Sequence, residues 1–415
     1  MKDAVIFSIG NELVEGLIID TNSKYISEKL KLLGYYVLRI ETLPDRLDIL
    51  SERIRIGLSE AELIITTGGL GPTEDDLTRE AVALAIGRNI EIDKKIADEL
   101  IERAIKYYGK SPESVVKQAM IIEGAKVLNN SVGTAPGQII DIEGKKIVIL
   151  PGPPAEMMPM FENILEDLKI DDALYTRRIK TIGIPEAILM DEHKDVIYSV
   201  PEITVATMAS YERGVEVRFT GSINQKENID KITNILIDRL GDNVYAIDDD
   251  TIEDVVYKLL KDNNLTISFA ESCTGGMISS KFVDIPGVSG VFKGAIVAYS
   301  NEVKKSILSV PEDVLNRYGA VSEECVKIMA KNVKEILNSD FAVAVSGIAG
   351  PEGGSEAKPV GTVCFAFANK NSVKTFTHTL RGNREMVRKK STLLAFDISR
   401  RGILEWLKLV KNTRE

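Results

Sequence analysis

Short runs of β-branched and aliphatic residues, each followed by a glycine-rich or polar segment, alternate with amphipathic stretches along this chain. Near the start, AVIFSIG, YVLRIETL and ELIITTGG are such runs, and TNSKYISEKLKLLGY separates the first two. This alternation predicts an open, largely parallel sheet with helices on both faces. Because ligands of such sheets bind at the carboxyl ends of the strands, we expect a site where these runs end.

The length and the pattern together predict three domains in an α/β chain. A chain of 415 residues is longer than one hydrophobic core usually sustains. We expect an open-sheet domain at 1–170 and a further α/β domain at 251–415. Between them, RRIKTIGI, ITVATMAS, GVEVRFTG and the helical ENIDKITNILIDRL predict a small α+β connecting domain at 171–250, with three strands and two helices. The acidic run 248–250 is interpreted as a linker and helix cap.

The composition indicates a cytoplasmic protein without a membrane or nucleic-acid partner. The net charge of −10 offers no broad basic field, and the N-terminus has neither a basic region nor a long apolar stretch of a signal peptide. No segment is as apolar as a membrane span. Three separated cysteines, Cys273, Cys325 and Cys364, form no CxxC pair, which favours a reducing compartment.

The chain has only two histidines, His193 and His378, and neither lies in a segment that resembles a site. Ser-His-Asp catalysis and histidine-rich zinc sites both require imidazoles near other reactive groups. We therefore expect both histidines to be structural. Any catalysis must use carboxylates, serine, lysine or a metal ion.

A serine follows a predicted strand in the segment AESCTGG and begins a predicted helix. Ser272 would lie beside unpaired amides suited to an oxyanion or a phosphate, although an N-cap alone explains such a residue. Lys304 follows the next strand, GAIVAYS, and burial could make it a base for Ser272, unless it is a solvated helix-start lysine. Lys293 is a lower-ranked rival base, and Cys273 has no nearby group to activate it.

Three further groups accompany this serine in the C-terminal third. Tyr299 and Asn301 should lie at the same strand end as Lys304. Arg384 begins the last helix and could bind a phosphate, although a surface salt bridge is the commoner fate of an arginine. A glycine-rich loop follows another predicted strand and contains Ser346, Gly347 and Gly350. Its glycines would let the backbone approach a ligand closely. The alternative is a flexible surface loop without a ligand.

The N-terminal third contains a glycine-rich, acidic strand-to-helix connection. Its amides could bind a phosphate through Thr67, Gly68, Gly69, Gly71 and Thr73. Asp75 or Asp76 could hold a hard divalent cation, and a metal between carboxylate and pyrophosphate would form a hydrolytic centre. Acids that cap a helix are the alternative, which we favour for Glu74.

Several long motifs of the C-terminal third, in fixed order, resemble those of the CinA C-terminal domain, the nicotinamide mononucleotide deamidases. These are AESCTGG, VAYSNEVK, GAVSEE, SGIAGPEGGSEAKPVGTVCFAF and GNREMVR. The resemblance implies an amidohydrolase without a cofactor, in which Ser272 attacks the carboxamide and Lys304 transfers the proton. It implies that the oxyanion donors are Thr274, Gly275 and Gly276. It also implies that the nucleotide is positioned by Tyr299, Asn301 and Arg384.

The first 170 residues resemble the molybdopterin-binding-like domain at the N-terminus of CinA proteins. The resemblance implies a metal-dependent ADP-ribose pyrophosphatase that uses Mg, Mn or Co and yields AMP and ribose 5-phosphate. It places further residues around the pocket, namely Gly10, Asn11, Glu12, Asn22, Gly133, Pro136, Gly137, Pro151, Gly152, Pro153 and Glu156. Together the two domains would form a bifunctional enzyme of NAD salvage, expected to be a homodimer.

Two alternatives without catalysis stay open. One is a molybdopterin-binding domain fused to a degenerate nucleotide-binding domain. The other is a competence or DNA-repair adaptor, which the acidic composition does not favour.

Overall fold

The computed structural model describes residues 2–110, 113–170 and 174–412. The chain divides into an N-terminal unit, Met1–Tyr175 with Ser222–Asn224, and a C-terminal unit, Thr176–Gly221 with Gln225–Glu415. Each is described by itself. Within the described ranges, no helix combines the length and apolarity needed to cross a bilayer.

The N-terminal unit contains a six-stranded sheet in the order β2-β1-β3-β8-β7-β6. The strands, in that order, are Tyr35–Leu43, Lys2–Ile9, Leu63–Thr67, Lys145–Leu150, Gly137–Ile142 and Lys126–Leu128. The four strands from β2 to β8 are parallel, as expected, whereas β7 and β6 are antiparallel. The reversal follows from the two-residue turn at Glu143 and Gly144, where positive φ angles of 49° and 80° suit a tight hairpin.

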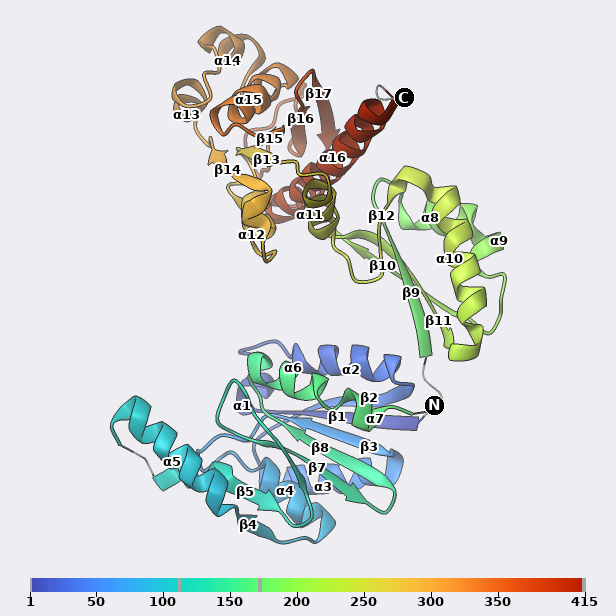
Figure 1. The fold of residues 1–415 in the computed structure, drawn as a ribbon, viewed down its shortest axis with the longest axis vertical. Coiled ribbons are helices and arrows are strands. Elements are labelled where there is room, and N and C mark those ends of the chain that lie inside the picture. Colours follow the sequence, from blue (N-terminus) through green and yellow to red (C-terminus); the bar gives the residue numbers. More distant parts are fainter. Residues whose placement is uncertain (1, 111–112, 171–173, 413–415) are drawn as a thin grey trace. The chain divides into compact units, whose positions relative to one another are not determined.

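Helices cover both faces of this sheet (Figure 1). One face carries α2 (Asn22–Leu32), α6 (Pro154–Glu162) and α7 (Leu165–Leu168), and the other carries α3 (Leu47–Glu60) and α4 (Thr78–Ile86). Strand β1 therefore supplies Ala4 and Ile6 to one core and Val5 and Phe7 to the other. Burial on both faces explains why its sequence is continuously apolar.

A projecting arm leaves this sheet after α4, a feature that the sequence pattern did not reveal (Figure 1). It is built from β4 (Ile90–Ile92), α5 (Lys94–Tyr108), the 3₁₀ helix η1 (Glu113–Ala119) and β5 (Met120–Ile122). Its own buried cluster is small. The short helix α1 (Asn11–Val14) follows β1 directly.

The first part of the C-terminal unit is a four-stranded sheet in the order β10-β11-β9-β12. The strands, in that order, are Thr204–Ser210, Gly214–Ser222, Leu174–Thr181 and Val244–Ile247, and the helices are α8 (Glu186–Glu192), α9 (Lys194–Ile197) and α10 (Lys226–Leu240), with 3₁₀ turns η2 (Ile223–Gln225) and η3 (Gly241–Asn243). Strand β12 adds a fourth strand to the three expected. The acidic run is not a free linker, because Arg177 and Arg178 pair with Asp248 and Asp249.

The rest of the C-terminal unit surrounds a five-stranded sheet in the order β14-β13-β15-β16-β17. The strands, in that order, are Phe292–Val297, Ile267–Glu271, Phe341–Gly347, Thr362–Ala368 and Val373–Thr379. The helices are α11 (Ile252–Asp262), α12 (Met277–Val283), α13 (Asn301–Ser306), α14 (Glu312–Tyr318), α15 (Glu323–Ile336) and α16 (Arg384–Asn412), with η4 (Val288–Gly290). Strands β14, β13 and β15 are parallel, which places their carboxyl ends at one edge.

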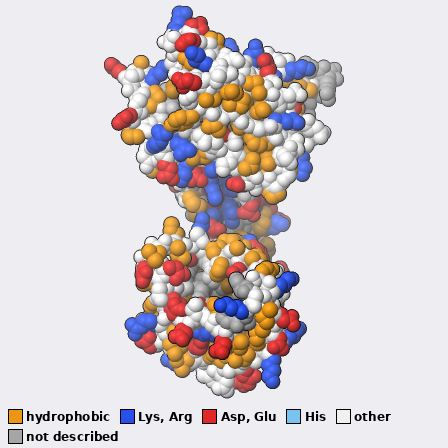
Figure 2. Space-filling model, turned by 90° about the vertical axis from the view of Figure 1, so that its left-hand side faces the viewer, with side chains coloured by type: hydrophobic (Ala, Val, Ile, Leu, Met, Phe, Trp, Pro, Cys, Tyr) orange, Lys and Arg blue, Asp and Glu red, His pale blue; other side chains and the backbone are white. Residues whose placement is uncertain are grey.

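Acidic and basic side chains are interspersed on the face of the N-terminal unit that Figure 2 shows. That face carries no continuous basic field. This distribution agrees with the net charge of −10.

A buried arginine of α16 joins the two sheets of the C-terminal unit. Arg400 is 5% exposed, pairs with Asp397 at 2.7 Å, and donates to the carbonyls of Asp242 and Val244. Arg401 pairs with the same carboxylate but is 39% exposed.

We predict that Arg400→Met lowers the free energy of unfolding by about 3–5 kcal/mol, because it takes the buried partner from the Asp397 carboxylate, leaving only the partly exposed Arg401, and removes the arginine donor from two carbonyls. Arg401→Met is the matched control and should cost less than about 1 kcal/mol, because that pair is partly solvated. Urea denaturation measures both values. Equal losses in the two variants would contradict the assignment.

Candidate functional site

A serine and a lysine meet where β13 ends. Ser272 directly follows β13, and Lys304 lies on α13, after the neighbouring strand β14. Lys304 Nζ is 3.0 Å from Ser272 Oγ. Lys304 is 1% exposed and Ser272 is 7% exposed. Lys293, the rival base, lies at the opposite end of β14, beside the start of β13.

The amino group of Lys304 has two backbone carbonyls as further hydrogen-bond acceptors. Its Nζ donates to the carbonyl oxygens of Ala298 at 2.8 Å and Tyr299 at 3.1 Å. Burial lowers the pKa of Lys304 below its ordinary value, because the charged form loses its water shell. An amine with two N–H groups on these carbonyls would direct its lone pair toward the Ser272 hydroxyl.

The turn after Ser272 is held by the buried carboxylate of Glu271. That carboxylate accepts from the amides of Gly276 at 2.9 Å, Ile278 at 3.1 Å and Ser279 at 2.9 Å, and from the Ser279 hydroxyl. The amide of Gly275 donates to the Ser272 carbonyl. Two of the three residues expected as oxyanion donors therefore have their amides engaged inside the turn.

The remaining amides of the turn are those of Cys273 and Thr274. The Cys273 amide contacts its own thiol, whereas the Thr274 amide has no hydrogen-bond partner among the described residues. The buried Thr274 hydroxyl also lacks one in that part of the chain. Arg388 on α16 donates to the carbonyls of Cys273 at 3.2 Å and Thr274 at 2.8 Å. The sequence analysis assigned no role to Glu271 or Arg388, although they lie within two motifs that it quoted, AESCTGG and GNREMVR.

The outer part of this site contains the expected Arg384 and Tyr299. Arg384 donates to the Tyr299 hydroxyl at 3.0 Å and to the Gly350 carbonyl at 2.8 Å. Tyr299 is 62% exposed, and Asn301, which begins α13, is also exposed. These side chains are accessible to a ligand.

Two further residues of the expected set have structural contacts. The Ser346 hydroxyl donates to the Ala320 carbonyl. A side chain at Gly347 would meet Val363 at 2.7 Å and the Cys273 sulfur at 3.1 Å. Their position at the end of β15 nevertheless places them beside the strand that carries Ser272.

Neither cysteine nor histidine chemistry fits this site. Burial raises the pKa of Cys273 to about 12, which disfavours the thiolate. His378 lies on β17 against Phe365, and burial lowers its pKa. His193 lies between α8 and α9. Within the described residues, neither imidazole is bonded to Ser272.

The N-terminal unit has a cavity of about 540 Å³ at the carboxyl ends of its parallel strands. The expected residues that line it are Gly10, Glu12, Asn22, Thr67, Gly68, Gly69, Gly71, Thr73, Asp75, Asp76, Pro151, Gly152, Pro153 and Glu156. Of the other expected residues, Asn11, Gly133 and Pro136 do not line it, and neither does Gly137. That glycine begins β7, where a side chain would meet the Met160 sulfur at 2.4 Å and the Ile149 carbonyl at 2.7 Å, so it serves packing.

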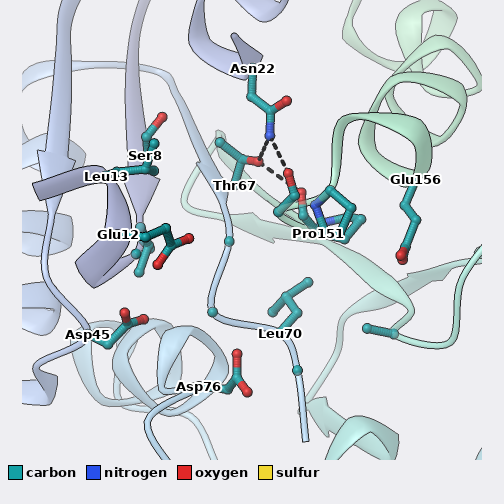
Figure 3. Close-up of a pocket in the computed structure, with 18 of the residues that line it drawn as sticks. Ser8, Glu12, Leu13, Asn22, Asp45, Thr67, Leu70, Asp76, Pro151 and Glu156 are labelled. Atoms are coloured by element: carbon teal, nitrogen blue, oxygen red, sulfur yellow. Dashed lines mark hydrogen bonds between the residues drawn. The ribbon is translucent and has the colours of Figure 1, made fainter. Parts of the chain in front are cut away.

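Hydrogen bonds join the loops that border this cavity (Figure 3). Asn22 donates to the Thr67 hydroxyl at 2.8 Å and the Gly152 carbonyl at 2.7 Å, and Thr67 donates to the Pro151 carbonyl. At Gly68, φ is 107° and a Cβ would lie 2.0 Å from the Ile9 carbonyl oxygen, so only glycine fits. The loops are therefore held in place by the chain itself.

Carboxylates gather on one side of the cavity, where Figure 3 shows Glu12, Asp45 and Asp76. Burial raises the pKa of Asp45, and the charges of Glu12, Asp75 and Asp76 add to this effect. Asp76 also accepts hydrogen bonds from the amide and the hydroxyl of Thr73, in the turn that precedes α4. Asp45 was missed, although its place just after β2 was a signal for it.

The donor chemistry suits a hard cation. Mutual repulsion among these carboxylates would be relieved by a divalent ion, and carboxylate oxygens are the ligands that Mg²⁺ prefers. In the described ranges, no three acidic, histidine or cysteine groups converge into a complete cage. This does not conflict with Mg²⁺, which is usually held by one or two carboxylates together with substrate phosphates.

Comparison with known proteins covers nearly the whole chain. Residues 5–170 match the model of a probable molybdopterin binding domain, residues 176–246 that of the damage-inducible protein CinA KH domain, and residues 249–403 that of the CinA C-terminal domain.

Full-length relatives are similar throughout. The chain is 65% identical to a CinA-like protein of Fervidobacterium nodosum over 98% of this chain and 99% of that relative. It is 54% identical to a CinA-like protein of Thermosipho melanesiensis, over 97% and 99%, and 40% identical to a putative competence-damage inducible protein of Thermoanaerobacter sp. strain X514, over 96% and 98%. With this identity extending over both units, the chain belongs to the CinA family.

Proposed function

We propose that the C-terminal unit hydrolyses a carboxamide by serine-lysine catalysis, with nicotinamide mononucleotide as its substrate. The observation that carries this proposal is the 3.0 Å contact between the buried Lys304 amine and the Ser272 hydroxyl. A lysine with a lowered pKa beside a serine is an activated nucleophile pair. The resemblance of the surrounding motifs to nicotinamide mononucleotide deamidases supports the choice of substrate.

The reaction proceeds in two halves. Ser272 Oγ attacks the carboxamide carbon while Lys304 Nζ takes its proton, and the tetrahedral intermediate expels ammonia with that proton. Water then attacks the resulting ester, Lys304 takes a proton from the water, and that proton returns to Ser272 Oγ. The products are ammonia and nicotinic acid mononucleotide, and the lysine ends in its starting state.

The outer residues would bind the nucleotide. Arg384 is exposed and offers a charged fork for the phosphate, and its contact with Tyr299 orients it. Tyr299 and Asn301 flank the entrance at the end of β14 and the start of α13. The backbone of the Gly350 loop lies within reach of the same arginine.

For the N-terminal unit, the cavity favours a second activity, the hydrolysis of ADP-ribose to AMP and ribose 5-phosphate. Its glycine loops border the cavity, where the backbone could approach phosphates closely, and Glu12, Asp45, Asp75 and Asp76 would supply oxygen ligands. A divalent cation held there would neutralise the pyrophosphate and act as a Lewis acid. Binding of a molybdopterin without hydrolysis is the alternative for this cavity, since that ligand also carries phosphate.

The partners that we propose are these small nucleotides, and we propose neither a nucleic-acid nor a membrane partner. We also propose that the protein is a homodimer and that it acts in the cytoplasm. Mass photometry or sedimentation of the purified chain tests the oligomeric state.

We predict that Ser272→Ala and Lys304→Met each lower kcat for ammonia release from nicotinamide mononucleotide by about 10³-fold or more, because each removes one half of the nucleophile pair. Lys305→Met is the matched control, since this neighbouring lysine is 42% exposed and pairs with Glu312. It should retain full activity. Absence of ammonia release by the wild-type chain would favour the noncatalytic alternative.

The lowered pKa of Lys304 sets the pH dependence. The neutral amine is the base, so kcat should rise as the pH increases through the pKa of Lys304, which lies below that of an ordinary lysine. At lower pH the ammonium form predominates and activity is lost. Measurement of kcat over roughly pH 6 to 10 tests this; a rate independent of pH throughout would refute lysine as the base.

We predict that AMP release from ADP-ribose stops in excess chelator and returns when Mg²⁺ or Mn²⁺ is added. Asp76→Asn and Asp45→Asn should each reduce the rate by about 10²-fold, because each removes an oxygen ligand. Glu74→Gln is the matched control, since Glu74 belongs to the same acidic run but does not line the cavity. Full activity in chelator would exclude the metal.

A further inference from the structure

We propose that Glu271 and Arg388 form a clamp on the turn Ser272–Gly276 that leaves the Thr274 amide as the oxyanion donor, a role that rests on the amidase function proposed above. Both are positioning residues, because they act through the backbone of the turn. Neither touches Ser272 Oγ or Lys304 Nζ in any described contact.

The acidic half of the clamp decides which amides are unavailable. Glu271 is fully buried, and its two carboxylate oxygens accept four hydrogen bonds from Gly276, Ile278 and Ser279. These are the donors at the start of α12 that would otherwise attract an anion. Glu271 thus removes the helix start as an oxyanion site and fixes the far end of the turn.

The basic half of the clamp decides which way the remaining amide points. Arg388 donates through Nε to the Cys273 carbonyl and through Nη2 to the Thr274 carbonyl. In a planar trans peptide, the N–H of Thr274 points opposite to the Cys273 carbonyl. It therefore points away from Arg388 on α16. A cation on that carbonyl also polarises the peptide and strengthens its N–H as a donor.

The geometry favours this role over direct binding of the substrate by Arg388. Two nitrogens of its guanidinium already donate to the backbone, and the side chain is partly buried. Arg384, one helical turn earlier, is exposed and contacts Tyr299 instead. The fork of an arginine reaches both carbonyls, whereas a lysine is a single point donor.

The test measures kcat and KM for nicotinamide mononucleotide with the full-length protein carrying Glu271→Gln, Arg388→Lys or Arg388→Met. We expect kcat to fall by about 10-fold to 100-fold, the scale for a displaced oxyanion donor, with KM changed by less than about threefold. Arg388→Lys should lose less than Arg388→Met. The pH at which kcat reaches half its maximum should not move, because the contacts of Lys304 are unchanged.

Two matched controls exclude a general effect on folding. Asp340 accepts from the amide and hydroxyl of Thr266 at the opposite end of β13, and Lys390 on α16 donates to the Arg381 carbonyl. Asp340→Asn and Lys390→Met should keep kcat within about twofold of wild type, since neither lies beside the turn. If Glu271→Gln fails to fold, the two Arg388 variants decide the outcome.

A fluorophosphonate probe separates failure of the clamp from failure of the proposed substrate. Ser272 Oγ forms the bond to phosphorus, fluoride leaves, and Lys304 takes the serine proton, so labelling requires no knowledge of the natural amide. Slower labelling of the clamp variants supports the clamp even if wild type does not deamidate the nucleotide. Labelling and kcat at wild-type levels in these variants would overturn it, as would a raised KM with kcat retained. A wild-type chain inactive in both assays would overturn both proposals.

Discussion

The C-terminal site depends on one buried amine. Lys304 is 1% exposed, and no carboxylate is among its contacts in the described part of the chain, so the fold must satisfy its N–H groups with backbone carbonyls. Burial without a carboxylate disfavours the ammonium form, and this lowers the pKa of Lys304. The same environment that makes this lysine costly to bury makes it useful as a base, provided that Ser272 lies within hydrogen-bond reach.

Both candidate sites use the same property of a parallel sheet. Buried strands end together at one edge, and each continues into a loop and a helix start, so that polar groups distant in sequence meet there. In the C-terminal unit, β13 and β14 bring Ser272 next to Lys304. In the N-terminal unit, β1, β2, β3 and β8 bring glycines, prolines and carboxylates to one cavity. The antiparallel strands at the far side of each sheet take part mainly in packing.

The two sites differ in how they treat negative charge. In the C-terminal unit, the buried Glu271 is fully satisfied by amides and a hydroxyl, and so it organises a turn. In the N-terminal cavity, Asp45 lies near three other carboxylates, and its pKa is raised by burial and by their charges. The first arrangement is complete without a ligand. The second would be stabilised by a cation, which is why the proposed chemistry of the N-terminal unit includes a metal.

The sequence by itself determined the α/β class and the strands that end in glycine loops, because strand ends are marked by a change from apolar runs to glycine and polar residues. The resemblance of its motifs to CinA domains, rather than this pattern, supplied further candidates such as Glu12, Asn22 and Glu156. Only the tertiary structure decided that Lys304 rather than Lys293 meets Ser272, since strand pairing places the two lysines at opposite ends of β14. It also decided that Gly137 serves packing and that Asp45, Glu271 and Arg388 belong to the sites. Such roles depend on contacts between residues as far apart as Thr274 and Arg388, and no local pattern records which distant partners a folded chain brings together.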